Sequence, residues 1–301
     1  MYPTPDQLAA CFPVAGLSFR DAGDGFVMAD IDTAHCTASV ALQGAHLSQW
    51  QPKSQAQSVV WCSPVAKFAH GKSIRGGVPV CWPWFGAHPG EASFPGHGFA
   101  RTVPWSLDSA GYTGDGAIEL AFSILPSEAG AKQWPHATPA ILRMKIGAVL
   151  EMELTTRNDS GEAITLGQAL HTYFTVGDIR DCSITGLEGC DYLDKVDGGA
   201  RKQQEGAIVI GSEVDRIYLG HPGTARIVDR ELGRTIRIDK RGSNSSIVWN
   251  PWLEKCVKMG DFGSDEGFLG MVCVESANAA DDVVQLAPGQ SHSLWVCYSI
   301  E

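Results

Sequence analysis

Alternation of apolar and polar residues is the dominant pattern along the chain. Leu150, Met152 and Leu154 alternate with two glutamates, and Ile236 and Ile238 alternate in the same way with polar neighbours. A period of two predicts strands that bury one face. Other candidate strands contain β-branched or aromatic residues and lie near Gly, Pro, Asn or Asp: 25–31, 38–42, 164–174, 247–250, 271–275 and 293–300.

Helical patterns are short by comparison. We expect only helical turns, at 5–11 and 64–70, and no long amphipathic helix. With 34 glycines and 16 prolines dividing the chain, the many strands predict an all-β fold, a large antiparallel β-sandwich. No repeat of fixed period is present, which disfavours a propeller. We expect a single domain over residues 1–301.

Composition narrows the function classes. Hydrophobic residues make up 44% of the chain, enough for a sizeable core, and the net charge is −11. Such a charge disfavours nucleic acid and acidic membranes as partners, and an anionic substrate would need a local basic site. Nine cysteines without a C-x-x-C pair, and a start without signal-peptide character, predict reduced thiols in the cytoplasm.

Common catalytic motifs are absent. The chain has no G-x-S-x-G, H-E-x-x-H, G-x-x-x-x-G-K-[ST] or G-x-G-x-x-G. Hydrolase, zinc-protease, P-loop and dinucleotide-binding functions therefore lose their usual support. The nine histidines show no close ligand spacing, so we expect neither a metal nor a cofactor.

The segment 74–101 is rich in glycine and proline, yet it is also aromatic. Its large rings are Trp82, Trp84, Phe85, Phe94 and Phe99. Two interpretations are open: a packed loop that covers one sheet, or the wall of a binding site, because sites often lie on loops held by a rigid scaffold.

Three ionisable residues stand out by their surroundings. Glu275 ends a strongly apolar strand, where a carboxylate is either paired structurally or held for function because leaving it unpaired is costly. His171 lies inside another apolar strand, as a core residue or a catalytic one. His97 lies between two glycines, where the backbone can approach a ligand closely.

Charged residues near these segments also have two interpretations. Arg75 and Arg101 flank the aromatic segment. Each could anchor it through carbonyls or a carboxylate, or both could bind one phosphate, which accepts bidentate hydrogen bonds. Asp215 could pair with Arg216 or accept a hydrogen bond from a sugar hydroxyl.

Taken together, the motifs resemble one family in their order along the chain. The matching blocks are I-R-G-G-V-P-V-C-W-P-W-F-G (74–86), H-G-F-A-R (97–101), L-H-T-Y-F (170–174), E-V-D-R-I-Y (213–218), V-W-N-P-W (248–252), K-M-G-D-F (258–262) and V-C-V-E (272–275). This set resembles the hexose-6-phosphate mutarotases, or glucose-6-phosphate 1-epimerases, of the aldose 1-epimerase group. That resemblance implies a galactose-mutarotase-like β-supersandwich and a monomeric enzyme acting on a sugar phosphate.

The resemblance also implies roles for individual residues. It makes His171 the general acid and Glu275 the general base in opening and closing the sugar ring. It assigns substrate binding to the remaining candidates: Arg75, His97, Arg101 and Asp215. We expect the acid and base to face one cavity, a sugar ring's width apart, with His97 beside the ring oxygen. Direct contact between the two would instead indicate a buried structural ion pair.

Three alternatives remain open. The enzyme could act on unphosphorylated aldoses, and the two arginines disfavour this without excluding it. The chain could be a non-catalytic sugar-binding module on the same fold, which an intact His171 and Glu275 argue against. A glycosidase would need two opposed carboxylates, and only Glu275 is a strong candidate.

Overall fold

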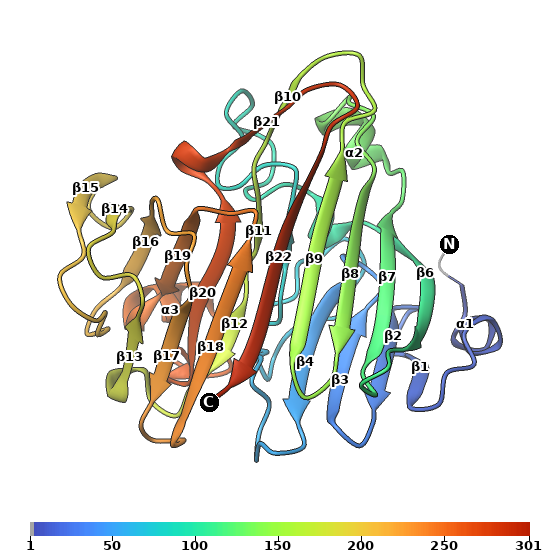
Figure 1. Ribbon diagram of the computed structural model, residues 1–301, viewed down its shortest axis with the longest axis horizontal. Coiled ribbons are helices and arrows are strands. Elements are labelled where there is room, and N and C mark those ends of the chain that lie inside the picture. The colour runs from blue at the N-terminus through green and yellow to red at the C-terminus, as the bar shows by residue number, and fades with distance from the viewer. Residues whose placement is uncertain (1–2) are drawn as a thin grey trace.

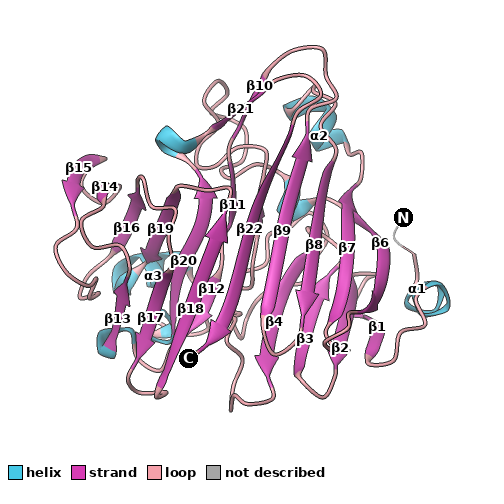
Figure 2. Cartoon of the chain, in the orientation of Figure 1, coloured by secondary structure: helices cyan, strands magenta, loops and turns pink. Residues whose placement is uncertain are grey.

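Two layers of antiparallel strands pack face to face (Figure 1). The computed structural model describes residues 3–301. Strands make up most of the chain, and the helices are short (Figure 2). The predicted antiparallel β-sandwich is confirmed.

The layer nearest the viewer in Figure 1 is one eight-stranded sheet in the order β13-β17-β18-β22-β9-β8-β7-β6. Its strands are β6 (Trp105–Tyr112), β7 (Ile118–Ile124), β8 (Ala140–Ile146), β9 (Leu150–Arg157), β13 (Cys182–Thr185), β17 (Ala225–Asp229), β18 (Arg234–Arg241) and β22 (Ser291–Ile300). The period-two patterns of β9 and β18 bury alternate residues, as the sequence predicts.

The second layer combines two sheets. The first is β15-β14-β16-β19-β20-β11-β5, with β12 also paired to β20: β5 (Val80–Cys81), β11 (Gln168–Leu170), β12 (Tyr173–Thr175), β14 (Asp191–Asp194), β15 (Ala200–Gln203), β16 (Val214–Tyr218), β19 (Ser245–Asn250) and β20 (Met271–Asn278). The second is β1 (Leu17–Asp21), β2 (Val27–Asp32), β3 (Cys36–Ala41) and β4 (His46–Pro52). An isolated bridge between Leu47 and Val78 joins them.

The helices lie at the ends and edges of the sheets. They are α1 (Pro5–Cys11), α2 (Glu128–Gln133) and α3 (Trp252–Met259). The helical turn predicted at 5–11 is confirmed as α1, which Thr4 caps. The turn predicted at 64–70 is wrong, because that segment forms no helix, and α2 and α3 were not expected. None of the helices within residues 3–301 is long and apolar enough to cross a membrane.

The strand predicted at 164–174 is broken into three pieces. They are β10 (Ile164–Leu166), which pairs with β21 (Val284–Leu286), and then β11 and β12. At the breaks the backbone bonds to the aromatic segment instead: Gly167 N–H donates to Pro83 O, and His171 N–H donates to Pro79 O. The aromatic segment therefore lies directly against the break that contains His171.

Both faces of the central strands β19 and β20 are buried. Val248 and Val274 belong to the main core between the layers. Trp249 and Cys273 point the other way, into a second apolar cluster. Because side chains alternate along a strand, Glu275 lies on the same face as Cys273. The candidate site is built on this outer face.

Candidate active site

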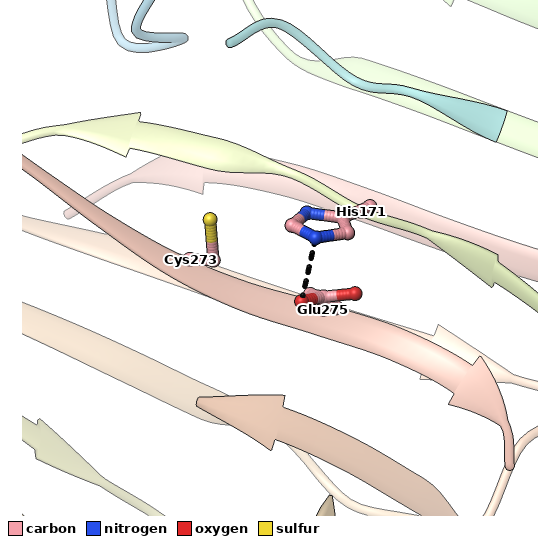
Figure 3. A group of neighbouring side chains, drawn as sticks. All are labelled: His171, Cys273 and Glu275. Carbon is pink, nitrogen blue, oxygen red and sulfur yellow. Dashed lines mark ion pairs between the residues drawn. The ribbon is translucent and has the colours of Figure 1, made fainter. Parts of the chain in front are cut away.

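Strand register brings His171 and Glu275 together. β12 pairs with β20 so that Tyr173 lies opposite Cys273, and β11 pairs with β20 in the same register. The register places His171 opposite Glu275, and such cross-strand neighbours have Cβ atoms about 4.5–5.5 Å apart. His171 Nε2 lies 3.3 Å from Glu275 Oε1 (Figure 3).

The pair is almost fully removed from solvent. The exposed fraction of the side chain is 12% for His171 and 2% for Glu275. The outer atom of each group, Nδ1 of His171 and Oε2 of Glu275, has no hydrogen-bond partner among the described residues. Buried polar atoms are nearly always satisfied. The absence of a partner for both His171 Nδ1 and Glu275 Oε2 therefore indicates that this pair binds a ligand or takes part in a reaction.

Burial shifts both groups toward their neutral forms. It raises the pKa of Glu275 well above its usual range, and the nearby charge of Asp215 adds to this. Burial also lowers the pKa of His171 well below its usual range, with the neighbouring positive groups acting in the same direction. Both shifts disfavour adding a second proton to the pair and removing the last one.

The expected separation of a sugar ring's width is wrong, because the two side chains are in contact. The expected strand end is also wrong, since Glu275 lies in the interior of β20. Direct contact is the arrangement that a buried structural ion pair would also have, so the two interpretations of Glu275 are not separated by the distance alone.

An aromatic ring supports His171 from one side. The rings of His171 and Tyr173 are stacked, with centroids 5.0 Å apart and planes inclined by 12°. Arg75 Nη1 donates to the Tyr173 hydroxyl at 2.8 Å, and Arg75 Nε donates to Asp261 at 3.0 Å. Arg75 is therefore anchored by a carboxylate, one of the two possibilities that its sequence position left open.

His97 reaches the site through a tight backbone turn. It has φ 68°, and Gly98 follows with φ 71°. A Cβ on Gly98 would lie 1.9 Å from the carbonyl oxygen of Trp82, so only glycine fits. The His97 ring packs edge-on against Phe85 and lies 5.8 Å from the ring of His171. Burial lowers the pKa of His97 to about 4, which leaves this imidazole neutral at pH 7.

Arg101 lies beside the same imidazoles with most of its donors unused. Its Nη2 donates to the carbonyl of Gly96 at 2.9 Å, so it too anchors the segment. No carboxylate within residues 3–301 pairs with it. Its positive charge contributes to lowering the pKa values of His97 and His171. A guanidinium has five N–H donors, so Arg101 retains both charge and donors for an anion.

The packed-loop interpretation of the aromatic segment is confirmed. Trp82, Trp84 and Phe99 are buried in the main core, as the packed-loop interpretation predicts. Phe85 and His97 are only partly buried and lie on the side of the acid–base pair. The tryptophans therefore hold the loop in place, and His97 with Phe85 lies beside His171.

Asp215 lies on the site face of β16, opposite Trp249. Its carboxylate is 4.0 Å from Lys255. The expected pair with Arg216 is not formed, because neighbouring residues of a strand point to opposite faces. Arg216 instead lies over the ring of Tyr192, at 4.7 Å from the centroid.

Sequence reasoning missed three residues of the site. Tyr173 and Cys273 each lie two positions from a predicted site residue, on the same face of a strand, so the period of two was a usable signal. The Cys273 thiol, whose pKa burial raises, lies within 4.8 Å of the ligand atoms of His171 and Glu275. Asp261 gave no signal, because only the fold brings it to Arg75.

The fold is of the galactose-mutarotase-like type. The sequence model of the family described as "Aldose 1-epimerase" matches residues 28–299, which is most of the chain. The chain belongs to the aldose 1-epimerase family.

Similar proteins from several organisms carry a more specific name. Two relatives named "Putative glucose-6-phosphate 1-epimerase" are 39% identical over 252 residues in Escherichia coli (83% of each chain) and 36% identical over 265 residues in Cenchrus ciliaris (85% of this chain, 79% of the relative). A crystal structure of a "putative mutarotase" from Salmonella typhimurium has a TM-score of 0.87 at 35% identity, covering 94% of this chain and 93% of that one.

Proposed function

We propose that this protein interconverts the α and β anomers of a hexose 6-phosphate, glucose 6-phosphate in particular, with His171 as general acid and Glu275 as general base. The observation that carries the proposal is the buried contact between these two groups, each with an unpaired atom. The names of the relatives support the substrate class.

The one-proton state of the pair suits ring opening. The Glu275 carboxylate takes the proton of the C1 hydroxyl while the His171 imidazolium gives a proton to the ring oxygen. The pair then holds a neutral carboxylic acid and a neutral imidazole, the forms that burial favours. After rotation about the C1–C2 bond, the reverse transfers close the ring on the other face. Each positioned acid or base typically contributes about 10²–10⁴-fold.

The remaining site residues are proposed to bind the substrate. A neutral His97, beside His171, can donate or accept a hydrogen bond at the ring oxygen side. Asp215, on the other side of Glu275 in the sheet, can accept from sugar hydroxyls. Since C6 is bonded to the ring carbon next to the ring oxygen, a 6-phosphate extends past His171. Arg101, together with Arg75, is proposed to receive it there.

A second candidate is mutarotation of unphosphorylated aldoses, because Arg75 already has two partners in this structure. Arg101 favours the phosphate. In a chain of net charge −11, a half-buried guanidinium beside the acid–base pair without a carboxylate partner is suited to an anion.

Anomer-exchange NMR on glucose, galactose and their 6-phosphates tests the proposal. We expect catalysed exchange of glucose 6-phosphate, with a higher kcat/KM than for glucose. Exchange on the free sugars alone would favour the second candidate. Absence of catalysed exchange on all four would refute mutarotation.

We further propose that the protein is a single domain and acts as a cytoplasmic monomer. All nine cysteines lie within the described residues and are free, which supports a reducing compartment. The net charge gives no support to nucleic acid or acidic membranes as partners. Light scattering during gel filtration measures the molar mass and tests this proposal. A monomer has a mass of 32.2 kDa, and a dimer would have twice that mass.

A further inference from the structure

The thiol of Cys273 lies beside the acid–base pair, yet proton transfer at the sugar does not require it. Figure 3 shows Cys273 and Glu275 on one strand, with the His171 ring across from them on the neighbouring segment. One donor atom from each of the three side chains lies within 4.8 Å of the other two. Nitrogen, sulfur and oxygen donors are thus gathered at one point.

We propose that His171, Cys273 and Glu275 form a binding site for Zn²⁺ or a similar borderline divalent cation, and that its occupation blocks the acid–base pair. Zinc is bound by histidine nitrogen, cysteine sulfur and carboxylate oxygen, and sites with three protein ligands keep a fourth position open. Mg²⁺ and Ca²⁺ prefer oxygen ligands, so they do not fit this donor set.

The geometry is close to that of a zinc site. Zinc–ligand bonds of about 2.0–2.3 Å in a tetrahedron place the ligand atoms about 3.5 Å apart. His171 Nε2 and Glu275 Oε1 are already 3.3 Å apart. The sulfur, at no more than 4.8 Å, needs a movement of about 1 Å, which a side-chain rotation supplies.

The polar atoms of the cluster also lack partners. Glu275 is buried, and its Oε2 has no hydrogen-bond partner among residues 3–301. A divalent cation would supply that missing interaction. Binding would release to solvent the thiol proton and any proton held by the His171–Glu275 pair, because the ligands are the thiolate, the neutral imidazole and the carboxylate. The cation would reach the site past His171, which retains a 12% exposed side chain.

The consequence for activity rests on the proposed function, whereas binding itself does not. A cation on His171 Nε2 and the Glu275 carboxylate would occupy the groups proposed to move protons, so bound zinc would inhibit anomer exchange. Cys273 does not transfer a proton in the proposed reaction. Its replacement should therefore separate inhibition from catalysis.

The test is direct cation binding to the wild-type protein and to Cys273→Ser, with Cys182→Ser, a buried cysteine of the other layer, as the matched control. Co²⁺ serves as the spectroscopic probe, because a thiolate ligand gives a charge-transfer band. Zn²⁺ is titrated by calorimetry. We expect one strong site in the wild type and in Cys182→Ser, and affinity at least about tenfold weaker in Cys273→Ser. Added zinc should inhibit exchange by the wild type and by Cys182→Ser, whereas whatever exchange Cys273→Ser retains should resist the same zinc concentration.

Equal zinc affinity in the wild type and Cys273→Ser, or a cobalt spectrum without the thiolate band, would overturn the inference. If Cys273→Ser does not fold, Cys273→Ala is measured in its place with the same expectations. The two proposals can fail separately. A protein that binds cobalt through thiolate but catalyses no exchange refutes the proposed function alone, and an active protein without the band refutes the zinc site alone.

Discussion

His171 Nε2 lies 3.3 Å from Glu275 Oε1, and the remaining polar atom of each side chain has no partner in the described part of the chain. Glu275 lies in β20 and His171 in the break between β11 and β12. They lie opposite one another because β11 and β12 share one register with β20. Backbone pairing therefore fixes the distance between the proposed acid and base. A pair held in this way is preorganised for two oxygens on one carbon.

The pH dependence of exchange should follow the pair as a unit. Burial lowers the pKa of His171 and raises that of Glu275. Activity should therefore be constant across neutral pH. It should fall at acidic pH, where His171 is protonated and the pair holds two protons. It should fall at alkaline pH, where Glu275 is deprotonated and the pair holds none. The measurement is kcat/KM by exchange NMR, with the uncatalysed rate subtracted at each pH. A single ionisation near the ordinary histidine pKa would contradict the one-proton pair.

Glu275 should reduce the stability of the fold as the pH rises. Its pKa is raised in the folded state, so the folded protein keeps a proton that the unfolded chain releases above its ordinary value. The contribution of Glu275 to stability is therefore fully present below its pKa in the unfolded chain. It is lost as the pH rises toward the raised pKa of the folded state. We expect Glu275→Gln to stabilise the protein at pH 8 by roughly 1 kcal/mol or more, and by less at pH 4.5.

Thermal unfolding at both pH values measures this effect. Glu119→Gln, on an exposed position of β7, is the control and should leave the unfolding temperature unchanged. A lower unfolding temperature for Glu275→Gln at pH 8 would show that the carboxylate stabilises the fold as half of an ion pair.

The two arginines should behave differently when removed. Arg101 has no carboxylate partner in the described residues. Arg101→Ala should therefore mainly weaken the binding of the phosphorylated substrate, by roughly 1.5–3 kcal/mol. Arg75→Ala leaves Asp261 and Tyr173 without their partner, so it should also lower the unfolding temperature. Rates on glucose 6-phosphate and on glucose, measured for both variants, test this. Equal losses on the two substrates for Arg101→Ala would make Arg101 purely structural.

Gly98 should tolerate no side chain. Its φ is 71°, and an added Cβ would lie 1.9 Å from the carbonyl oxygen of Trp82. Gly98→Ala should cost about 2 kcal/mol or more and move His97 away from the pair. Gly96→Ala is the matched control, because its Cβ would lie 3.7 Å from the nearest atom. Urea unfolding of both variants measures this difference in stability. Similar urea midpoints for Gly98→Ala and Gly96→Ala would contradict the steric argument.

Much of the fold was predictable because half-buried strands alternate apolar and polar residues with a period of two. That signal located β9 and β18, whereas β-branched and aromatic residues located β22, and together these strands predicted the antiparallel sandwich. The strand prediction failed over 164–174, where hydrogen bonds to Pro79 and Pro83 break the strand. Such bonds join residues far apart in sequence and leave no local pattern. The short helix α3 was missed because Leu253 and Val257 are exposed and give no clear apolar stripe.

The candidate residues could be selected from the sequence, but the spacing between them could not. Apolar surroundings marked His171 and Glu275, and alternation would have added Tyr173 and Cys273. The contact between the pair depends on the register of strands about 100 residues apart in sequence, which no single segment encodes. The partners of Arg75 and Asp215 likewise come from α3 and the loop after it.

Anomer exchange by Glu275→Gln on glucose 6-phosphate tests the central claim most directly. Glutamine keeps the shape of the side chain but cannot accept the C1 hydroxyl proton as a base. Two-dimensional exchange NMR should show the catalysed rate falling by about 10²–10⁴-fold, while titration calorimetry still detects binding of the sugar phosphate. Exchange by Glu275→Gln at close to the wild-type rate would contradict the account, and another residue would have to be the base.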